Sequence, residues 1–272
     1  MSKNKKEYRN ELATANKIVV KIGTDCLTNK KSKLDISKLN QLVSNFMVLP
    51  NEEKEGVLVS SGAIGAGVGK LSLKEEPEEM ESLQAASTIG QSELMRRYSE
   101  SFERYNRQVA QLLLTQQDFT NPTRFENLKN TIEELLEWKI IPIINENDAI
   151  AIEEIRMGDN DLLSAFTASG IKADLLIILT DVDGLHEKNP KKCSDAKRMK
   201  TVEKIDENIL NLTRKTSERD FGGIQTKIEA AKIATEEGIP VIITKGGKND
   251  VIKKIIEGKD IGTLFLPQKR TK

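Results

Sequence analysis

The sequence predicts an α/β fold: a three-layer αβα sandwich with a mostly parallel central sheet. Predicted strands and helices alternate along the whole chain, as they do in proteins built from βαβ units. The predicted strands are continuous apolar runs, such as residues 175–179, rather than runs that alternate apolar and polar residues. Both faces of the sheet are therefore expected to be covered by helices.

The strands are predicted from apolar runs of four to eight residues bounded by Gly, Pro, Asn or Asp. They are expected at residues 17–23, 56–60, 108–114, 140–145, 174–180, 239–244 and 262–266. Residues 187–206 are charged and are expected to form a surface excursion with short strands.

The helices are predicted from apolar residues that recur every three to four positions, as Ile36, Leu39 and Val43 do. They are expected at residues 35–49, 79–105, 122–138, 162–169, 223–237 and 251–257, with a further helix start in the glycine-rich segment 61–69. Pro122 suits the first turn of its helix, because its missing N–H is not needed there. Residues 1–16 are polar and are expected to form a loose tail or a short helix.

The composition excludes several classes of protein. The chain has 272 residues with 42 basic and 42 acidic side chains, which argues against a general role on nucleic acid or a membrane surface. The two cysteines, Cys26 and Cys193, match neither a metal-binding spacing nor a disulfide framework, which favours a reducing, cytoplasmic setting. No apolar signal core and no apolar run of membrane-spanning length is present, so no membrane span is expected.

Two polar clusters lie next to apolar segments. Residues 145–148 (Asn-Glu-Asn-Asp) follow a predicted buried strand, and residues 158–161 (Gly-Asp-Asn-Asp) open a predicted apolar helix. Carboxylates beside apolar segments are costly unless they are paired or hold a ligand. Amide donors mixed with carboxylates suit a small zwitterion such as an amino acid. The alternative is that these residues serve only as turn and helix-cap residues.

Two lysines lie beside glycines. Lys21 interrupts the apolar strand 17–23 and precedes Gly23, so it needs an anion nearby unless it is an edge-strand lysine that reaches solvent. Lys227 follows Gly222 and Gly223 at the start of a predicted helix, where the helix dipole disfavours a lysine unless an anion is bound. The alternative for residues 221–227 is an ordinary glycine-rich loop with an exposed lysine.

Two further segments are candidates for ligand binding. Residues 60–67 are small and glycine-rich after a strand, which allows either a close ligand at a helix N-terminus or close packing of helix on sheet. They match neither a Walker A loop nor a dinucleotide fingerprint. Thr180 and Asp181 end the most apolar strand and could hold a sugar or base hydroxyl group. The sole histidine, His186, lies in a charged turn, so histidine-based catalysis is not expected.

These parts together predict a phosphoryl-transfer site. Two lysines on separate glycine loops, with acidic residues between them, can position a transferring phosphoryl group and cancel its charge. No general base is needed if the nucleophile is already a carboxylate.

Six segments resemble the amino acid kinase family, and within it the members that phosphorylate L-glutamate. These are Ile18–Thr24, Val59–Ile64, Gln111–Thr115, Pro142–Asp148, Met157–Asp161 and Leu179–Asp181. The resemblance runs from about residue 17 to 267, and the two polar clusters are its most specific parts.

The resemblance implies ATP-dependent phosphorylation of the γ-carboxylate of L-glutamate, the first step of proline synthesis. It implies one kinase domain over residues 17–267, with a substrate lobe at 17–170 and a nucleotide lobe at 171–267, after an N-terminal tail at 1–16. It implies that Lys21 and Lys227 flank the phosphoryl group while Asp159 holds the lysines in place. The expected substrate-binding residues are Ser61, Gly62, Asn145, Asp148, Asn160 and Asp161. The expected nucleotide-binding residues are Lys21, Gly23, Thr180, Asp181, Phe221, Gly222, Gly223, Ile224, Gln225, Thr226 and Lys227.

The resemblance also implies ATP and Mg²⁺ as cofactors, with the metal on the ATP phosphates rather than on protein side chains. It implies a homo-oligomer, dimer or tetramer, proline as a possible feedback inhibitor and glutamyl-phosphate reductase as a possible partner. Two departures stand out: the chain ends just after the kinase region, where many relatives carry a PUA domain, and Phe221 replaces a threonine of the nucleotide loop.

Two alternatives remain open at this point. One is a kinase of the same fold that acts on N-acetylglutamate, carbamate or isopentenyl phosphate. Asp148 and Asp161 favour a free amine over an acetylated one, and a pocket without histidine disfavours isopentenyl phosphate. The other alternative is a non-catalytic amino-acid sensor, which the two lysines disfavour.

Overall fold

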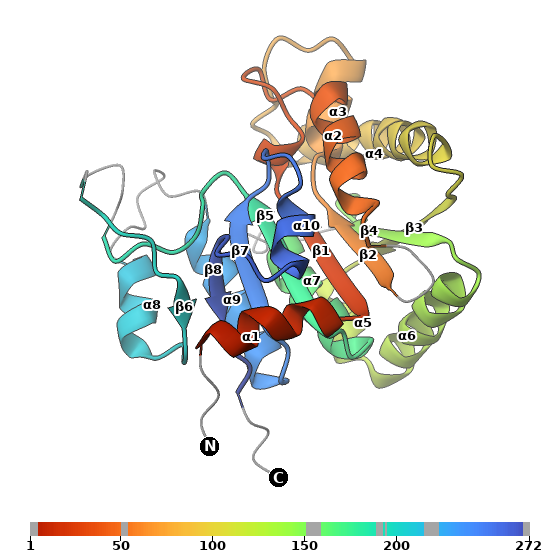
Figure 1. The fold of residues 1–272 in the computed structure, drawn as a ribbon. Helices are drawn as coiled ribbons and strands as arrows, with labels where there is room; N and C mark the ends of the chain where they lie inside the picture. Colours follow the sequence, from red (N-terminus) through yellow and green to blue (C-terminus); the bar gives the residue numbers. More distant parts are fainter. Residues whose placement is uncertain are drawn as a thin grey trace.

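An eight-stranded β-sheet runs through the centre of the computed structural model (Figure 1). The structure describes residues 5–49, 54–150, 159–188, 193, 195–214 and 223–268. The strands are β1 (Lys17–Ile22), β2 (Glu55–Ser60), β3 (Val109–Leu114), β4 (Ile141–Glu146), β5 (Leu175–Thr180), β6 (Thr201–Val202), β7 (Val241–Lys245) and β8 (Thr263–Phe265). Their order is β3-β4-β2-β1-β5-β7-β8-β6, and every pair is parallel except β7 with β8. The predicted fold class is confirmed.

Helices cover both faces of the sheet. They are α1 (Lys5–Glu11), α2 (Ile36–Phe46), α3 (Ala63–Lys70), α4 (Met80–Glu103), α5 (Gln116–Thr120), α6 (Pro122–Glu137), α7 (Asp159–Gly170), α8 (Glu207–Arg214), α9 (Ile224–Glu236) and α10 (Val251–Ile256), with short 3₁₀ turns η1 (Leu12–Thr14) and η2 (Thr24–Cys26). Core residues of α2, α3, α4 and α10 pack on one face, and those of α6, α7, α8 and α9 pack on the other. In Figure 1, α1, α2 and α10 lie in front of the sheet.

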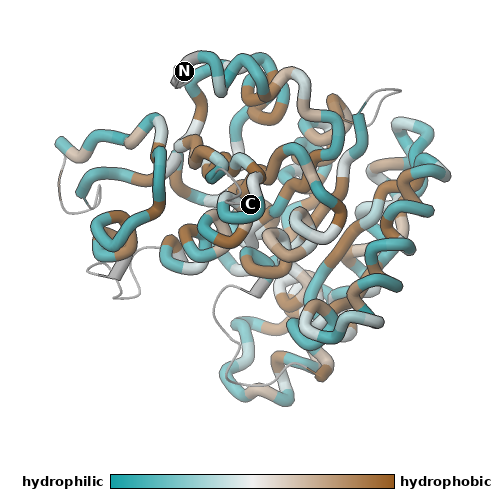
Figure 2. Tube along the Cα trace, turned by 90° about the horizontal axis from the view of Figure 1, so that it is seen from below, coloured by the Kyte–Doolittle hydropathy of each residue, from teal (hydrophilic) through white to brown (hydrophobic). Residues whose placement is uncertain are grey.

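Each central strand contributes to both cores because successive side chains point to opposite faces. In β1, Ile18, Val20 and Ile22 join the core with α2 and α4, whereas Val19 joins the core with α7 and α9. This alternation places Lys21, two residues after Val19, on the α7 and α9 face. Figure 2 shows the resulting apolar interior, with hydrophilic segments on the outer helices.

The two halves of the chain share this continuous sheet. Strands β1 to β4 come from residues before 147 and β5 to β8 from residues after 174, and β1 pairs with β5 at the centre. The connection from β4 to β5, which includes α7, crosses from one half to the other. The division into a substrate lobe and a nucleotide lobe remains a prediction.

The sequence did not predict α5 or α8. Helix α5 is only five residues long, too short for an apolar repeat, and it is stabilised by a capping box between Thr115 and Asp118. Helix α8 follows the charged excursion, which contains the short strand β6, as expected.

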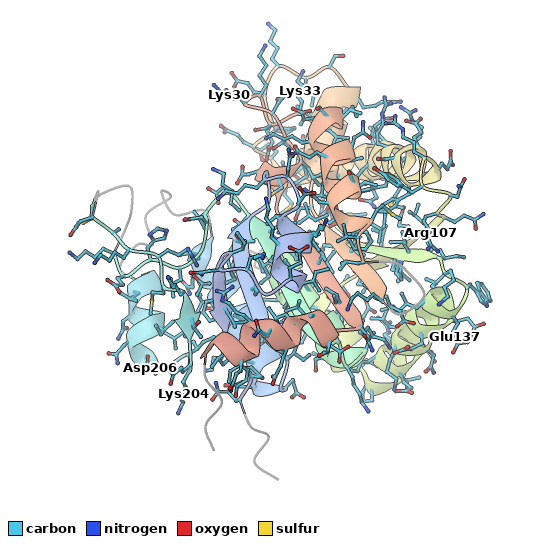
Figure 3. All side chains as sticks on the ribbon, viewed as in Figure 1. Lys30, Lys33, Arg107, Glu137, Lys204 and Asp206 are labelled. Carbon is cyan, nitrogen blue, oxygen red and sulfur yellow. The ribbon has the colours of Figure 1, made fainter. Side chains whose placement is uncertain are left out.

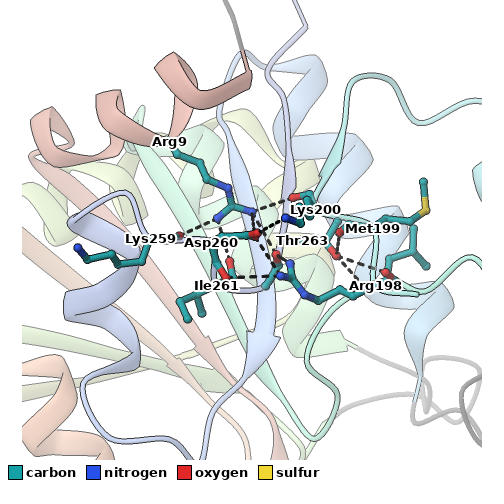
Figure 4. Close-up of polar contacts among 10 residues, drawn as sticks. Arg9, Arg198, Met199, Lys200, Lys259, Asp260, Ile261 and Thr263 are labelled. Atoms are coloured by element: carbon teal, nitrogen blue, oxygen red, sulfur yellow. Dashed lines mark hydrogen bonds and ion pairs between the residues drawn. The ribbon is translucent and has the colours of Figure 1, made fainter. Parts of the chain in front are cut away.

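Arg9 anchors helix α1 to the second half of the chain (Figure 4). Its guanidinium group is buried and lies 3.5 Å from the carboxylate of Asp260, which also pairs with Arg198 at 3.0 Å. It donates hydrogen bonds of 2.7–3.1 Å to the carbonyl oxygens of Lys200, Lys259, Ile261 and Gly262. Within the segment 1–16, which was expected to form a loose tail or a short helix, residues 5–11 form a short helix held against the loop before β8.

The periphery of the described chain is charged. Figure 3 shows Lys30 and Lys33 on the projecting segment between β1 and α2, and Glu137 near the end of α6. None of the described helices has both the length and the apolarity needed to cross a membrane.

Candidate active site

Four neighbouring parallel strands bring the predicted site residues to one edge of the sheet. Strands β4, β2, β1 and β5 lie side by side, so their carboxyl ends meet at the same edge. Asn145, Ser61, Gly23 and Thr180 lie at or directly after these ends. In open α/β sheets this edge is where ligands bind.

Two buried lysines converge on one carboxylate at this edge. The Nζ of Lys21, on β1, lies 2.7 Å from Oδ1 of Asp161, and the Nζ of Lys227, on α9, lies 3.2 Å from Oδ2 of the same residue. Thr226 donates its hydroxyl to Oδ2 at 2.8 Å. The two ammonium groups, which come from opposite halves of the chain, are therefore neighbours.

The charges of the lysines keep Asp161 ionised. The side chain of Asp161 is only 1% exposed, and burial alone would raise its pKa. The positive charges of Lys21 and Lys227, with hydrogen bonds from Lys21 and Thr226, outweigh burial, so the pKa of Asp161 lies below its ordinary value of 3.8. The cluster thus fixes two cations at a defined place in a water-poor site.

Asp161 makes a contact that the sequence did not predict, and the role predicted for Asp159 stays a prediction. Asp161 was predicted to line the substrate pocket, and Asp159 was predicted to hold the lysines. The structure shows Asp161 between the lysines. The side chain of Asp159 lies outside the described residues, although α7 begins at this position.

A chain of amide hydrogen bonds links the two polar clusters to β2. Asn160 donates from Nδ2 to Oδ1 of Asn145 at 2.9 Å and to Oγ of Ser61 at 3.0 Å. Asn145 donates from Nδ2 to Oε1 of Gln91, on α4, at 2.9 Å. The structure therefore brings together Ser61, Asn145 and Asn160, which the sequence assigned to the substrate. The Oδ1 atom of Asn160 is buried and has no hydrogen-bond partner in the described part of the chain.

Asp148 lies next to α4, without a cationic partner among the described residues. Ser87 donates its hydroxyl to Oδ2 of Asp148. Burial raises the pKa of Asp148 above its ordinary value of 3.8, and the hydrogen bond from Ser87 offsets this only in part. An ammonium group bound here would stabilise the carboxylate, so Asp148 is suited to a substrate amine.

Replacement of Asp148 by asparagine is expected to stabilise the free protein and weaken substrate binding. A carboxyl group with a raised folded pKa contributes stability that is fully present below its ordinary pKa and is lost as the pH rises through the folded value. At pH 7, Asp148→Asn should therefore raise the free energy of unfolding by no more than about 1 kcal/mol, and this gain should disappear on acidification towards pH 3. Urea denaturation at several pH values measures it.

The same variant should bind L-glutamate, the substrate that the resemblance implies, about 100-fold more weakly, since it loses a charge-assisted hydrogen bond. Titration calorimetry measures this loss. Asp174 provides the matched control, because its exposed carboxylate accepts the backbone N–H groups of Asn16 and Lys17. Asp174→Asn should not stabilise the protein. An Asp148→Asn protein less stable than wild type at pH 7 would contradict the expectation.

The structure describes only some of the expected nucleotide-binding residues. Gly223 caps α9 in the left-handed conformation (φ 63°), and a Cβ there would meet Oγ1 of Thr226 and Nζ of Lys227 at 3.4 and 3.5 Å. The side chain of Ile224 packs in the core, so only its backbone remains for a ligand. Gln225 is exposed and donates to Glu229 on its own helix. Phe221 and Gly222 lie outside the described residues.

The remaining nucleotide candidates lie at the ends of β1 and β5. Thr180 is buried and donates its hydroxyl to the carboxylate of Asp181 at 3.0 Å. The N–H of Gly23 donates to the carbonyl oxygen of Leu179 at 2.9 Å, which ties the two strand ends together. Among the described residues, no three His, Cys, Asp or Glu side chains lie together as a metal site would require.

The glycines of residues 61–69 have two roles. Gly62 caps α3 with a φ of 101° and follows Ser61, which faces Asn160. Gly67 and Gly90 instead let α3 and α4 approach closely, because a Cβ at either position would overlap backbone atoms of the other helix. Close packing is therefore observed at Gly67, against α4 rather than against the sheet, and a ligand at the N-terminus of α3 stays a prediction.

Sequence reasoning missed the contribution of helix α4. Ser87, Gln91 and Tyr98 are buried on the face of α4 that also carries Leu94. They contact Asp148, Asn145 and Ser60, in that order. The signal was present in the sequence, because polar residues at positions i, i+4 and i+11 share a helix face with apolar ones.

Comparisons with known proteins identify the family of the chain. The family model described as "Amino acid kinase family" matches residues 16–245. A glutamate 5-kinase of Clostridium tetani is 43% identical over 266 residues, which cover 97% of this chain and 98% of the relative. A glutamate 5-kinase of Caldanaerobacter subterraneus subsp. tengcongensis is 45% identical over 254 residues, which cover 93% of this chain and 68% of the relative.

Solved structures share the fold at low sequence identity. The carbamate kinase from Giardia lamblia bound to AMP-PNP superposes with a TM-score of 0.64 at 19% identity, covering 94% of this chain and all of that one. Isopentenyl phosphate kinase superposes with a TM-score of 0.62 at 17% identity, covering 92% of this chain and all of that one. By sequence and by fold, the chain belongs to the amino acid kinase family.

Proposed function

We propose that the chain transfers the γ-phosphoryl group of ATP to the γ-carboxylate of L-glutamate, which gives L-glutamyl 5-phosphate and ADP. This reaction is the first step of proline biosynthesis. The observation that carries the proposal is the pair of lysines held by Asp161, next in the chain to Asn160 and its hydrogen bond with Asn145. Relatives that are 43–45% identical over more than nine tenths of this chain are glutamate 5-kinases, which supports the same substrate.

The pocket suits a free amino acid. Asp148 and Oδ1 of Asn160, which has no partner among the described residues, can accept hydrogen bonds, and both would bind the substrate ammonium group. The hydroxyl of Ser61 accepts from Asn160 and so remains able to donate to a carboxylate oxygen. Asn145 lines this pocket and orients Asn160. An acetylated amine carries no positive charge, so it could not form an ion pair with Asp148.

The two lysines would stabilise the charge on the transferring group. A carboxylate oxygen of glutamate attacks the γ-phosphorus, and the bond from that phosphorus to the bridging oxygen of ATP breaks. The electron pair of that bond leaves with ADP, and no proton moves. Lys21 and Lys227 would contact the phosphoryl oxygens from opposite sides while Asp161 keeps the ammonium groups in place.

ATP would lie along the carboxyl ends of β1, β5 and β7 and against the start of α9. Helix N-termini bind phosphate through free N–H groups, and Gly223 leaves the approach to Lys227 open. Thr180, Asp181, Gly23 and the loop 221–227 remain the proposed nucleotide contacts. Mg²⁺ would sit on the ATP phosphates and neutralise part of their charge.

Further expectations follow from the same proposal. Proline would inhibit by binding where glutamate binds, the protein would assemble as a dimer or tetramer, and glutamyl-phosphate reductase would take the labile product. The reaction would take place in the cytoplasm.

The test traps the acyl phosphate. Purified protein incubated with ATP, Mg²⁺, L-glutamate and hydroxylamine should form γ-glutamyl hydroxamate, which ferric chloride detects by colour. A panel of N-acetylglutamate, carbamate and isopentenyl phosphate, read by ADP release, should give much lower turnover. Folded protein that produces no hydroxamate but turns over another acid would assign a different kinase. Glutamate-dependent thermal stabilisation without any turnover would assign a sensor.

A further inference from the structure

Gln91 lies in the buried interface between α4 and the polar end of β4. Its side chain is 7% exposed, and its Oε1 accepts a 2.9 Å hydrogen bond from Nδ2 of Asn145. Its own Nε2 is buried and has no hydrogen-bond partner among the described residues. No step of the proposed reaction uses Gln91 directly.

A backbone N–H fixes the orientation of Asn145. The N–H of Glu146 can only donate, and it lies 2.9 Å from the Asn145 side chain, so the atom facing it must be Oδ1. The Nδ2 of Asn145 then points towards Gln91. Only an acceptor satisfies it there, so Gln91 must present its Oε1. The orientation of Gln91 thus follows from that of Asn145.

The same oxygen of Asn145 fixes the orientation of Asn160. Oδ1 of Asn145 can only accept, so Asn160 must present Nδ2 to it. The second N–H of that Nδ2 donates to Ser61. Among the described residues, Oδ1 of Asn160 is left as an acceptor without a partner, and Ser61, whose oxygen accepts from Asn160, can still donate its hydroxyl hydrogen. A zwitterion needs this pair, an acceptor for its ammonium group and a donor for its carboxylate.

We propose that Gln91 is a positioning residue for the amino-acid substrate, acting through Asn145 to hold Asn160 and Ser61 in this orientation. The inference rests on the proposed function, because it assumes that Asn160 and Ser61 bind glutamate. Gln91 supplies the acceptor that Asn145, only 3% exposed, would otherwise lack. Without it, Asn145 must turn to find another acceptor for Nδ2, and this turn would break its bond with Asn160.

The first test compares two substitutions of Gln91. Gln91→Leu removes the acceptor at similar volume and should raise the KM for L-glutamate about 10- to 100-fold, with the KM for ATP within about threefold. Gln91→Glu keeps the acceptor, loses no hydrogen bond to a described residue and, because burial favours the neutral form of a carboxyl group, adds little charge; it should keep the KM for glutamate within about threefold of wild type. Gln91→Met serves as a second apolar variant if the leucine protein does not fold.

Asn45 provides the matched control. It is an equally buried amide on α2, and it donates to the carbonyl of Lys248 and accepts from the N–H of Asp250. Asn45→Leu should lower the thermal stability as Gln91→Leu does but leave the KM for glutamate unchanged. Equal effects of the two leucine variants on this KM would reduce Gln91 to a structural residue and overturn the proposal.

A double-mutant cycle tests the route through Asn145. If Gln91 acts only through it, Gln91→Leu should change the KM for glutamate by less than about twofold in an Asn145→Ala background. An effect of full size in that background would overturn the proposed route.

A readout without substrate separates this inference from the proposed function. In protein labelled with ¹⁵N at asparagine, the side-chain N–H resonances of Asn145 and Asn160 should shift in Gln91→Leu and stay in place in Asn45→Leu. Unchanged resonances in Gln91→Leu would refute the positioning role even if glutamate is the substrate. If the resonances shift but the protein does not phosphorylate glutamate, the positioning role of Gln91 stands and only the proposed substrate is rejected.

Discussion

Replacement of Lys227 by alanine is expected to lower kcat about 10³-fold, with the KM for L-glutamate changed by less than about threefold. The reason is that Lys227 would touch the transferring phosphoryl group, whose charge is redistributed in the transition state, and not the amino acid. Lys21, whose Nζ lies 2.7 Å from Asp161 in the wild-type structure, should remain paired with it in this variant, so the fold should survive. Steady-state kinetics with the hydroxamate assay measure both constants.

Lys232 is the matched control for this substitution. It lies on the same helix, α9, but its side chain is 45% exposed and 4.0 Å from Glu236. Lys232→Ala should leave kcat within about twofold of wild type, since exposed pairs of this kind contribute little. A Lys227→Ala enzyme with unchanged kcat would remove Lys227 from the mechanism. A large rise in the glutamate KM at constant kcat would place it in the substrate pocket.

Much of the fold could be predicted because a sheet buried on both faces requires strands that are apolar at nearly every position. In a parallel sheet covered by helices, each central strand is apolar throughout, and β5 is buried at all six positions. Lys21 stood out in β1 for the same reason, since a cation in such a strand requires an anion. Short elements gave no such signal, which is why α5 and α8 were not predicted.

The roles of individual acidic residues were harder to predict, because they depend on the rotation of a helix about its axis. Asp159 and Asp161 lie in the same first turn of α7, and of these two the structure describes only the side chain of Asp161. Asp161 shares its face with Ala165 and Ala168, both fully buried, at i+4 and i+7. This spacing was available in the sequence, but Leu162 and Leu163 are also apolar, so the pattern did not show which face of α7 is buried. The support from α4 depended on a tertiary contact between segments more than 50 residues apart.

Replacement of Asp161 by asparagine is expected to lower the free energy of unfolding at pH 7 by about 3–5 kcal/mol, the usual cost of breaking a buried ion pair. Asparagine keeps the size of the side chain but removes the negative charge that lies between Lys21 and Lys227. The two ammonium groups would then repel each other in a buried site. Catalysis should fall with stability, because lysines driven apart no longer converge on one phosphoryl group. Chemical denaturation and kinetics measure the two effects.

The pH dependence separates the charge of Asp161 from its shape. Because the folded pKa of Asp161 is depressed, its contribution to stability is fully present above the ordinary value of 3.8 and is lost as the pH falls through the folded value. The stability difference between wild type and Asp161→Asn should therefore be constant from neutral pH to about pH 5 and shrink at lower pH. Glu137, exposed at the end of α6, provides the control, and Glu137→Gln should show no comparable difference. A difference that stays constant into acid would show that packing, and not charge, makes Asp161 necessary, and the two lysines would then need another anion to hold them together.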